Sequence, residues 1–146
     1  MVLRYSLTGI TALLSLCCVA LLLCAAPVHA ETMADSNAIH SGPCTKHTAG
    51  RTVVLEINPR PVRHMAELTF TVTVTPGTDI PSTLTLDLTM PGMYMGKNQV
   101  MLQKKRTGTW EGKGVIVRCM SGRKLWQATI LSTDLDNPSF TFEVRD

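Results

Sequence analysis

Methionine sulfurs are concentrated in one short stretch of this chain. The run MPGMYM at residues 90–95 places three thioethers within six consecutive residues. Thioethers are soft, neutral ligands that need no deprotonation, so they favour Cu(I) over Zn²⁺ or Mg²⁺. Met93 and Met95 point to the same side if the backbone after Gly92 is extended, because side chains alternate along extended chain. Met93 and Met95 are therefore the first candidate ligands for Cu(I).

Three further residues could complete such a site, namely Met90, His64 or Met101. Met90 also continues the alternation of leucines over residues 84–88, which is typical of a side chain that fills the core. A second interpretation of the methionine run is an adaptable apolar contact surface for a partner protein of the cell envelope. Both interpretations, a copper ion as ligand and an envelope protein as partner, stay open at this point.

Cys44 and Cys119 are the only cysteines beyond residues 1–30. Two cysteines in an exported domain most simply form one structural disulfide. A thiolate metal site or a thiol–disulfide carrier is the alternative, but the pair lacks the Cys-x-x-Cys spacing that lowers a thiol pKa. The sequence therefore predicts a Cys44–Cys119 disulfide.

Several classes of function lack a sequence signature. The histidines form no metal-protease pair, and no nucleophile elbow, phosphate-binding glycine loop or dinucleotide fingerprint occurs. The net charge is only +3, and the cluster Lys104–Arg106 precedes a Thr-Gly pair, as in a solvated hairpin turn. Nucleic-acid binding needs a clustered basic face. We expect neither an enzyme nor a nucleic-acid partner.

The elements that must position these residues are β-strands. Apolar and polar residues alternate strictly over Leu68–Thr75 and over Leu84–Met90, and a Pro-Gly pair follows each run. Shorter runs complete the pattern: Thr52–Ile57, Gln99–Gln103, Thr109–Met120, Leu125–Leu131 and Phe140–Val144. Seven strands separated by Gly and Pro turns predict an all-β domain, an immunoglobulin-like antiparallel β-sandwich.

The phase of two of these runs predicts which side chains face the core. Val115, Val117 and Cys119 share one phase, so Cys119 is expected to point inward. Trp126 shares a face with Ala128, which predicts a tryptophan that anchors the core beside the disulfide.

The N-terminal part of the chain has a different character. The 146 residues are 45% hydrophobic but only 5% aromatic, and an uncharged run over Gly9–Ala26 inflates the first figure. Arg4 precedes this run, and Pro27 with a Val-x-Ala site follows it, as in a secretory signal peptide cleaved after Ala30. An uncleaved membrane anchor is the alternative, because the run is near the lower limit for a span. Residues 1–30 therefore predict a periplasmic or otherwise extracytoplasmic protein.

The rest of the chain divides into two parts. Residues 31–50 are polar, small or turn-forming and show no periodic apolar pattern, so we expect a flexible leader. The β-sandwich then occupies residues 51–146.

Several motifs occur in an order that resembles the YtkA-like / FixH-like family, small extracytoplasmic β-sandwich domains of bacteria. The motifs are Pro59-Arg60-Pro61, Leu68–Val72, Met90–Met95, Trp110-Glu111-Gly112 and Gly122-Arg123 followed by Trp126. The resemblance spans Thr52–Val144. It implies an immunoglobulin-like domain associated with copper handling, respiratory oxidase maturation or envelope interactions. Met93 and Met95 match the turn methionines of the family and Trp126 its core tryptophan, whereas the cysteine pair and the cleavage site depart from the FixH-like pattern.

Overall fold

The computed structural model describes residues 36–146 of the chain. The expected signal peptide at residues 1–30, and the alternative of an uncleaved anchor, lie outside these residues. Within the described part, neither helix has the length and apolar character needed to cross a membrane. These helices are the short α2 (Ala38–Ser41) and the 3-10 helix η2 (Thr133–Leu135), so the described fold is all-β.

Eight strands form a single antiparallel sheet in the order β1-β2-β3-β6-β5-β4-β7-β8. They are β1 (Cys44–Thr48), β2 (Arg51–Asn58), β3 (Glu67–Thr75), β4 (Thr83–Thr89), β5 (Gln99–Arg106), β6 (Thr109–Val115), β7 (Leu125–Leu131) and β8 (Ser139–Glu143). The all-β prediction is confirmed, and β2 to β8 correspond to the seven predicted strands. The main difference in bounds is that β6 ends at Val115, five residues before the predicted end.

The segment expected to be a flexible leader instead contributes ordered structure. Residues 44–48 pair along their whole length with residues 51–55 of β2. The strand β1 has the sequence CTKHT, so no apolar alternation was present from which to predict it. The helix α2 places Ile39 in the core with no exposed surface.

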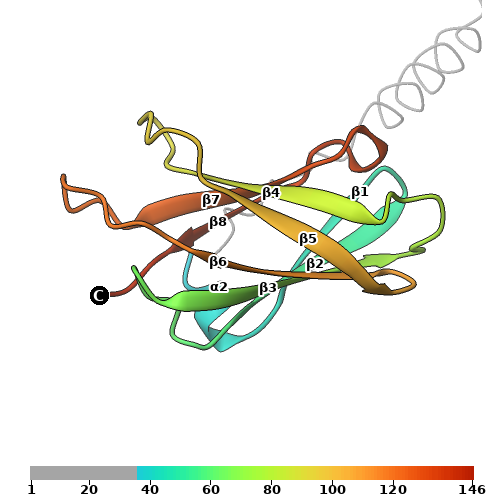
Figure 1. The fold of residues 1–146 in the computed structure, drawn as a ribbon, viewed down its shortest axis with the longest axis horizontal. Coiled ribbons are helices and arrows are strands. Elements are labelled where there is room, and N and C mark those ends of the chain that lie inside the picture. Colours follow the sequence, from blue (N-terminus) through green and yellow to red (C-terminus); the bar gives the residue numbers. More distant parts are fainter. Residues whose placement is uncertain (1–35) are drawn as a thin grey trace, which may run out of the picture. The chain divides into compact units, whose positions relative to one another are not determined.

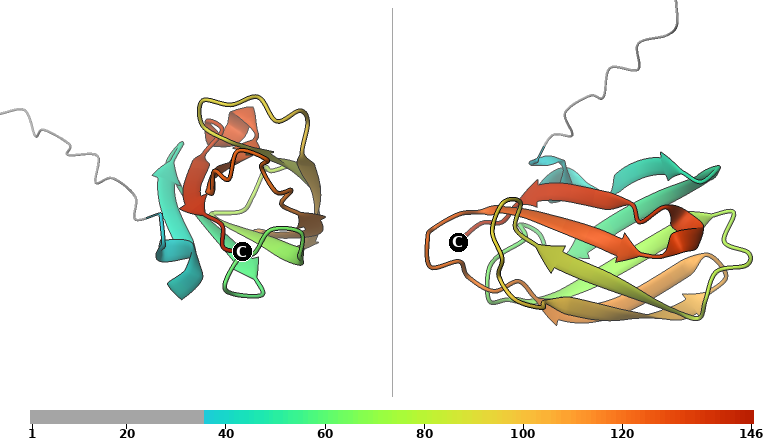
Figure 2. Two further views of the ribbon diagram at one scale, coloured as in Figure 1. Left: turned by 90° about the vertical axis from the view of Figure 1, so that its left-hand side faces the viewer. Right: turned by 90° about the horizontal axis from the view of Figure 1, so that it is seen from above.

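The sheet curls until its two edge strands approach each other, as the left view of Figure 2 shows. A cavity of about 380 Å³ lies between β1 and β8, with residues of both strands in its walls. The Lys46 ammonium of β1 lies 6.0 Å from the centre of the Phe140 ring of β8. The sheet is continuous because β4 pairs with β5 on one side and with β7 on the other.

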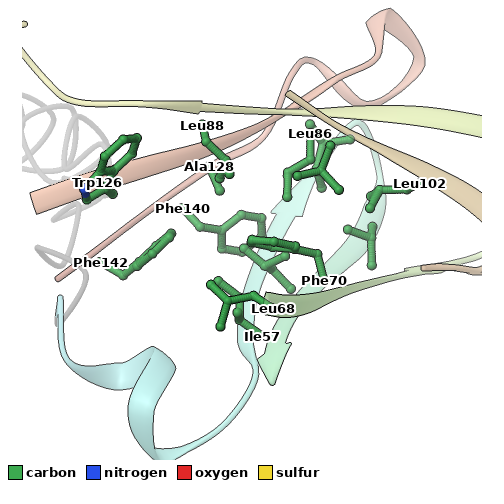
Figure 3. Packing of buried hydrophobic residues seen from close by; sticks show 14 of the residues in the cluster. Ile57, Leu68, Phe70, Leu86, Leu88, Leu102, Trp126, Ala128, Phe140 and Phe142 are labelled. Atoms are coloured by element: carbon green, nitrogen blue, oxygen red, sulfur yellow. The ribbon is translucent and has the colours of Figure 1, made fainter. Parts of the chain in front are cut away.

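The core fills the inside of this curled sheet (Figure 3). Every second residue of β3 is buried, from Leu68 to Val74, while the threonines between them are only half-buried. The few aromatic rings concentrate here, and Trp126, Phe140 and Phe142 come from the neighbouring strands β7 and β8. The core position predicted for Trp126 is therefore confirmed.

Antiparallel pairing brings the chemically interesting loops to one end of the sheet. The β4–β5 loop, yellow in Figure 1, and the β6–β7 loop, orange, both lie at its left, together with the C-terminus. The β2–β3 connection joins them, because the His64 N–H donates to the Arg145 carbonyl and the Met65 N–H to the Ile116 carbonyl. We call residues 59–66, 90–98, 116–124 and 144–146 the site end.

Candidate metal centre

The thiol of Cys119 lies against the thioether of Met93 at the site end. Cys119 Sγ is 3.6 Å from Met93 Sδ, and in the neutral form the thiol donates to the thioether. Cys119 is only 4% exposed, and Met93 is half-buried against the core. Two soft sulfur atoms from different loops therefore meet at a site that is largely shielded from solvent.

A tight turn at the end of β4 sets the position of Met93. Gly92 adopts a φ of 74°, a left-handed conformation that favours glycine, and the Met93 N–H donates to the Met90 carbonyl at 3.1 Å. After this turn Met93 and Met95 are both half-buried, whereas Tyr94 between them is 93% exposed. This alternation is the one expected of extended backbone, with both methionines on the same side.

Hydrogen bonds stabilise the ionised form of Cys119. Ser121 Oγ lies 3.0 Å from Cys119 Sγ. The Ser121 hydroxyl and the Ser121 backbone lower the pKa of Cys119, and the backbone and charge of Arg123 lower it further, against the opposing effect of burial. Since the thiolate is the form of cysteine that binds metal, this environment favours metal binding.

His64 is a second potential ligand next to Cys119. The two residues line the same cavity, which has a volume of about 280 Å³. His64 is buried, and its Nδ1 lies 3.1 Å from the Val117 carbonyl oxygen. A carbonyl only accepts, so Nδ1 carries the proton and the lone pair of the neutral ring is on Nε2. The imidazole is thus held in the tautomer in which Nε2 can bind a metal.

The other two methionines that the sequence suggested as ligands have different surroundings from Met93. Met90 is buried in the core, where it continues the leucine face of β4. Met101 is 58% exposed on β5, and the Thr85 hydroxyl donates to its sulfur at 3.7 Å. Its chain neighbours Val100 and Leu102 are buried, so Met101 lies on the outer face of the sheet.

The disulfide predicted between Cys44 and Cys119 is not formed in the described part of the chain. Cys44 begins β1 and lines the cavity between β1 and β8, as Phe140 does. Cys119 instead belongs to the β6–β7 loop and contacts Met93. The two thiols therefore have separate surroundings, and no bridge supports the core beside Trp126.

The burial of Cys119 was predicted correctly, but for a reason that the structure corrects. The prediction assumed that Cys119 follows the phase of Val115 and Val117 along a long strand. Both valines are partly exposed, Ile116 between them is fully buried, and β6 has already ended at Val115. Cys119 is buried because the loop folds back on itself, with the Gly122 N–H donating to the Cys119 carbonyl at 3.1 Å.

The sequence does not predict the contact between Cys119 and Met93, because it favours a disulfide for Cys119. The only local signal of a special environment for Cys119 is the hydroxyl of Ser121, two residues further along the same loop. Among residues 36–146 there is no group of three or more His, Cys, Asp or Glu side chains that could hold a metal ion. The candidate centre therefore combines methionine sulfur with one thiol and one imidazole.

Comparison of the chain with protein-family models, curated proteins and solved structures found no match. The function of the site must therefore be inferred from its own atoms. These are a thiol with a lowered pKa, a thioether in contact with it, and an imidazole with a fixed tautomer on the wall of the same cavity.

Replacing Ser121 by alanine should raise the pKa of Cys119. The Ser121 hydroxyl makes the largest contribution to the lowered value, so its loss leaves less thiolate at any pH below the ordinary thiol pKa. The pH dependence of iodoacetamide alkylation at Cys119, followed by mass spectrometry, should shift its midpoint upward. Cys44 in the same digest is the internal control and should keep its midpoint. An unchanged midpoint at Cys119 would contradict the assigned hydrogen bond.

Proposed function

We propose that this protein binds Cu(I) at the site end through Met93, Cys119 and His64. The observation that carries the proposal is the 3.6 Å contact between Cys119 Sγ and Met93 Sδ. Two sulfurs bonded to one metal ion at about 2.3 Å each are about 3.8 Å apart in tetrahedral geometry. The two sulfur atoms are thus already close to the separation that a shared ion requires.

The chemistry of the donor set favours Cu(I) among biological metals. One thiolate and one thioether are soft ligands, and imidazole is compatible with copper. The Cys119 thiol loses its proton when the ion binds, and the hydrogen bonds from Ser121 lower the cost of that step. The Val117 carbonyl orients the His64 ring, as backbone carbonyls often do for metal-binding histidines. Met95, half-buried on the same side as Met93, is a candidate for a third sulfur ligand.

The wider role follows from the resemblance to the YtkA-like / FixH-like family. We propose a non-enzymatic domain with an immunoglobulin-like fold that acts outside the cytoplasm, after export by a signal peptide at residues 1–30. Copper handling or maturation of a respiratory complex is the role that this resemblance supports. The alternative, a structural or interaction module of the envelope, is supported by the exposure of Tyr94 in the methionine loop.

Competition with a Cu(I) chelator tests the proposal. The protein should take up one equivalent of Cu(I). Met93→Leu should weaken binding by about tenfold or more, since losing only a hydrogen bond to a metal ligand already costs that much. Met101→Leu is the matched control, because Met101 lies on the outer face of β5, and its affinity should equal that of the original chain. Equal affinities of the two variants would show that Met93 is not a ligand. All variants also carry Cys17→Ser, Cys18→Ser and Cys24→Ser, so that no thiol of residues 1–30 competes for Cu(I).

A further inference from the structure

Large apolar side chains project into solvent from the loops around the proposed copper site. Met120 is fully exposed and Tyr94 is 93% exposed, and Met65 in the β2–β3 connection is largely exposed as well. Each of these residues is a near neighbour in the chain of a buried or half-buried site residue, namely Cys119, Met93 or His64. Exposed apolar groups clustered around a recessed site are typical of a contact surface.

The same loops carry a strong excess of positive charge. The basic residues of the site end are Arg60, Arg63, Lys97, Arg118, Arg123, Lys124 and Arg145, and the only acidic residue in these segments is Asp146. Asp146 is already engaged, because its carboxylate lies 2.6 Å from Lys124 Nζ and 3.9 Å from Arg118 Nη2. Arg60 is likewise paired, with Glu56 at 3.0 Å, and Glu143 lines a second cavity with Arg123 and Lys124. The seven basic residues still outnumber these three carboxylates, so the surface remains cationic around the site.

The cations lie close to the proposed ligands. Arg118, Arg123 and Lys124 line the cavity that Cys119 and His64 share. The Arg123 guanidinium also reaches the methionine loop, because its Nη1 is 3.9 Å from the position that a Cβ on Gly92 would occupy. A partner attracted by these charges would therefore arrive directly over the copper site.

We propose that the site end is a docking surface for an acidic protein that exchanges Cu(I) with this domain. The exchange rests on the proposed function, whereas the docking itself rests on charge complementarity and exposed apolar contacts. Cys119 is only 4% exposed, so a partner must bring its own soft ligand to the cavity mouth, which an anionic lipid cannot do. In the exchange a Cu–S bond to the partner breaks as a Cu–S bond to Met93 or Cys119 forms. The Cys119 proton passes to water, and copper stays Cu(I).

The docking arm of the test uses no copper. A fluorescent peptide with methionines flanked by glutamates is titrated with metal-free protein, and a matched peptide has glutamine in place of each glutamate. We expect the acidic peptide to bind about tenfold more tightly at low salt and to lose this advantage at high salt. Arg118→Gln with Lys124→Gln should abolish the preference. Lys104→Gln with Lys105→Gln, near the end of β5 and outside the site end, is the matched control and should retain it.

The copper arm uses the same two peptides loaded with Cu(I). Transfer to the protein should be about tenfold faster from the acidic peptide, because charge attraction accelerates encounter. Equal transfer rates, or equal binding of the metal-free peptides, would overturn the proposal. Preferential binding to phosphatidylglycerol vesicles over the acidic peptide would overturn it in favour of a membrane. If the chelator competition shows no Cu(I) uptake while the acidic peptide still docks, the copper function fails and the docking surface stands.

Discussion

Replacing Cys119 by serine should lower the affinity of the protein for Cu(I) by at least about a hundredfold, the upper end of what losing a hydrogen bond to a metal ligand costs. The change removes a soft, negatively charged ligand and leaves a hard, neutral hydroxyl of similar size. The loss of affinity therefore comes from the change of donor atom and not from a change in packing. Cys44→Ser is the matched control, because Cys44 lies at the cavity between β1 and β8. Its affinity for Cu(I) should remain that of the original chain.

Proton release distinguishes a ligand from a residue that merely supports the fold. Cu(I) binding should release about one proton from the Cys119 thiol, so affinity should fall as the pH falls below the pKa of Cys119. Because that pKa is lowered, the fall begins at a lower pH than for an ordinary cysteine. Cys119→Ser should release no proton, as measured by calorimetry in buffers of different ionisation enthalpy. Retained affinity and retained proton release in this variant would rule out Cys119 as a ligand.

The strands could be predicted because one face of each is apolar and the other polar. In β3 and β4 a period of two is unbroken, so a shift by one residue would move every threonine into the core. The strand β1, with the sequence CTKHT, has no such alternation. It is an edge strand, and only its first and last residues are half-buried. Its position depends on pairing with β2, a long-range contact that the local sequence does not specify.

The candidate site could be predicted only in part, for a related reason. The methionine run identified Met93 from the types and spacing of local residues. The second sulfur, that of Cys119, lies in another loop, 26 residues after Met93 in the chain. Its position depends on where β6 ends and how the β6–β7 loop folds back, and neither feature has a periodic signal. Ligands that lie in one segment could therefore be predicted from the sequence. A site whose ligands come from two loops could be identified only from the folded structure.

Trp126→Ala should destabilise the domain by about 3–5 kcal/mol, the range for removing a large buried aromatic side chain. Trp126 has no exposed surface, and it faces Phe142 across the β7–β8 pair. Its indole nitrogen makes no hydrogen bond within the described residues, so the loss is one of packing. Leu125→Ala is the matched control on the same strand, because Leu125 points to solvent and should cost within about 0.5 kcal/mol.

Urea unfolding followed by the fluorescence of Trp110 measures both variants, because Trp110 remains as a buried reporter. The midpoint of Trp126→Ala should fall while the slope stays constant, as expected when stability changes without loss of two-state behaviour. Domains of this size have a total stability of about 5–15 kcal/mol, so the change would remove a large share of it. A loss similar to that of Leu125→Ala would contradict the view that this tryptophan anchors the core. Because β7 follows the loop that holds Cys119, a loosened anchor should also weaken Cu(I) binding in Trp126→Ala but not in Leu125→Ala.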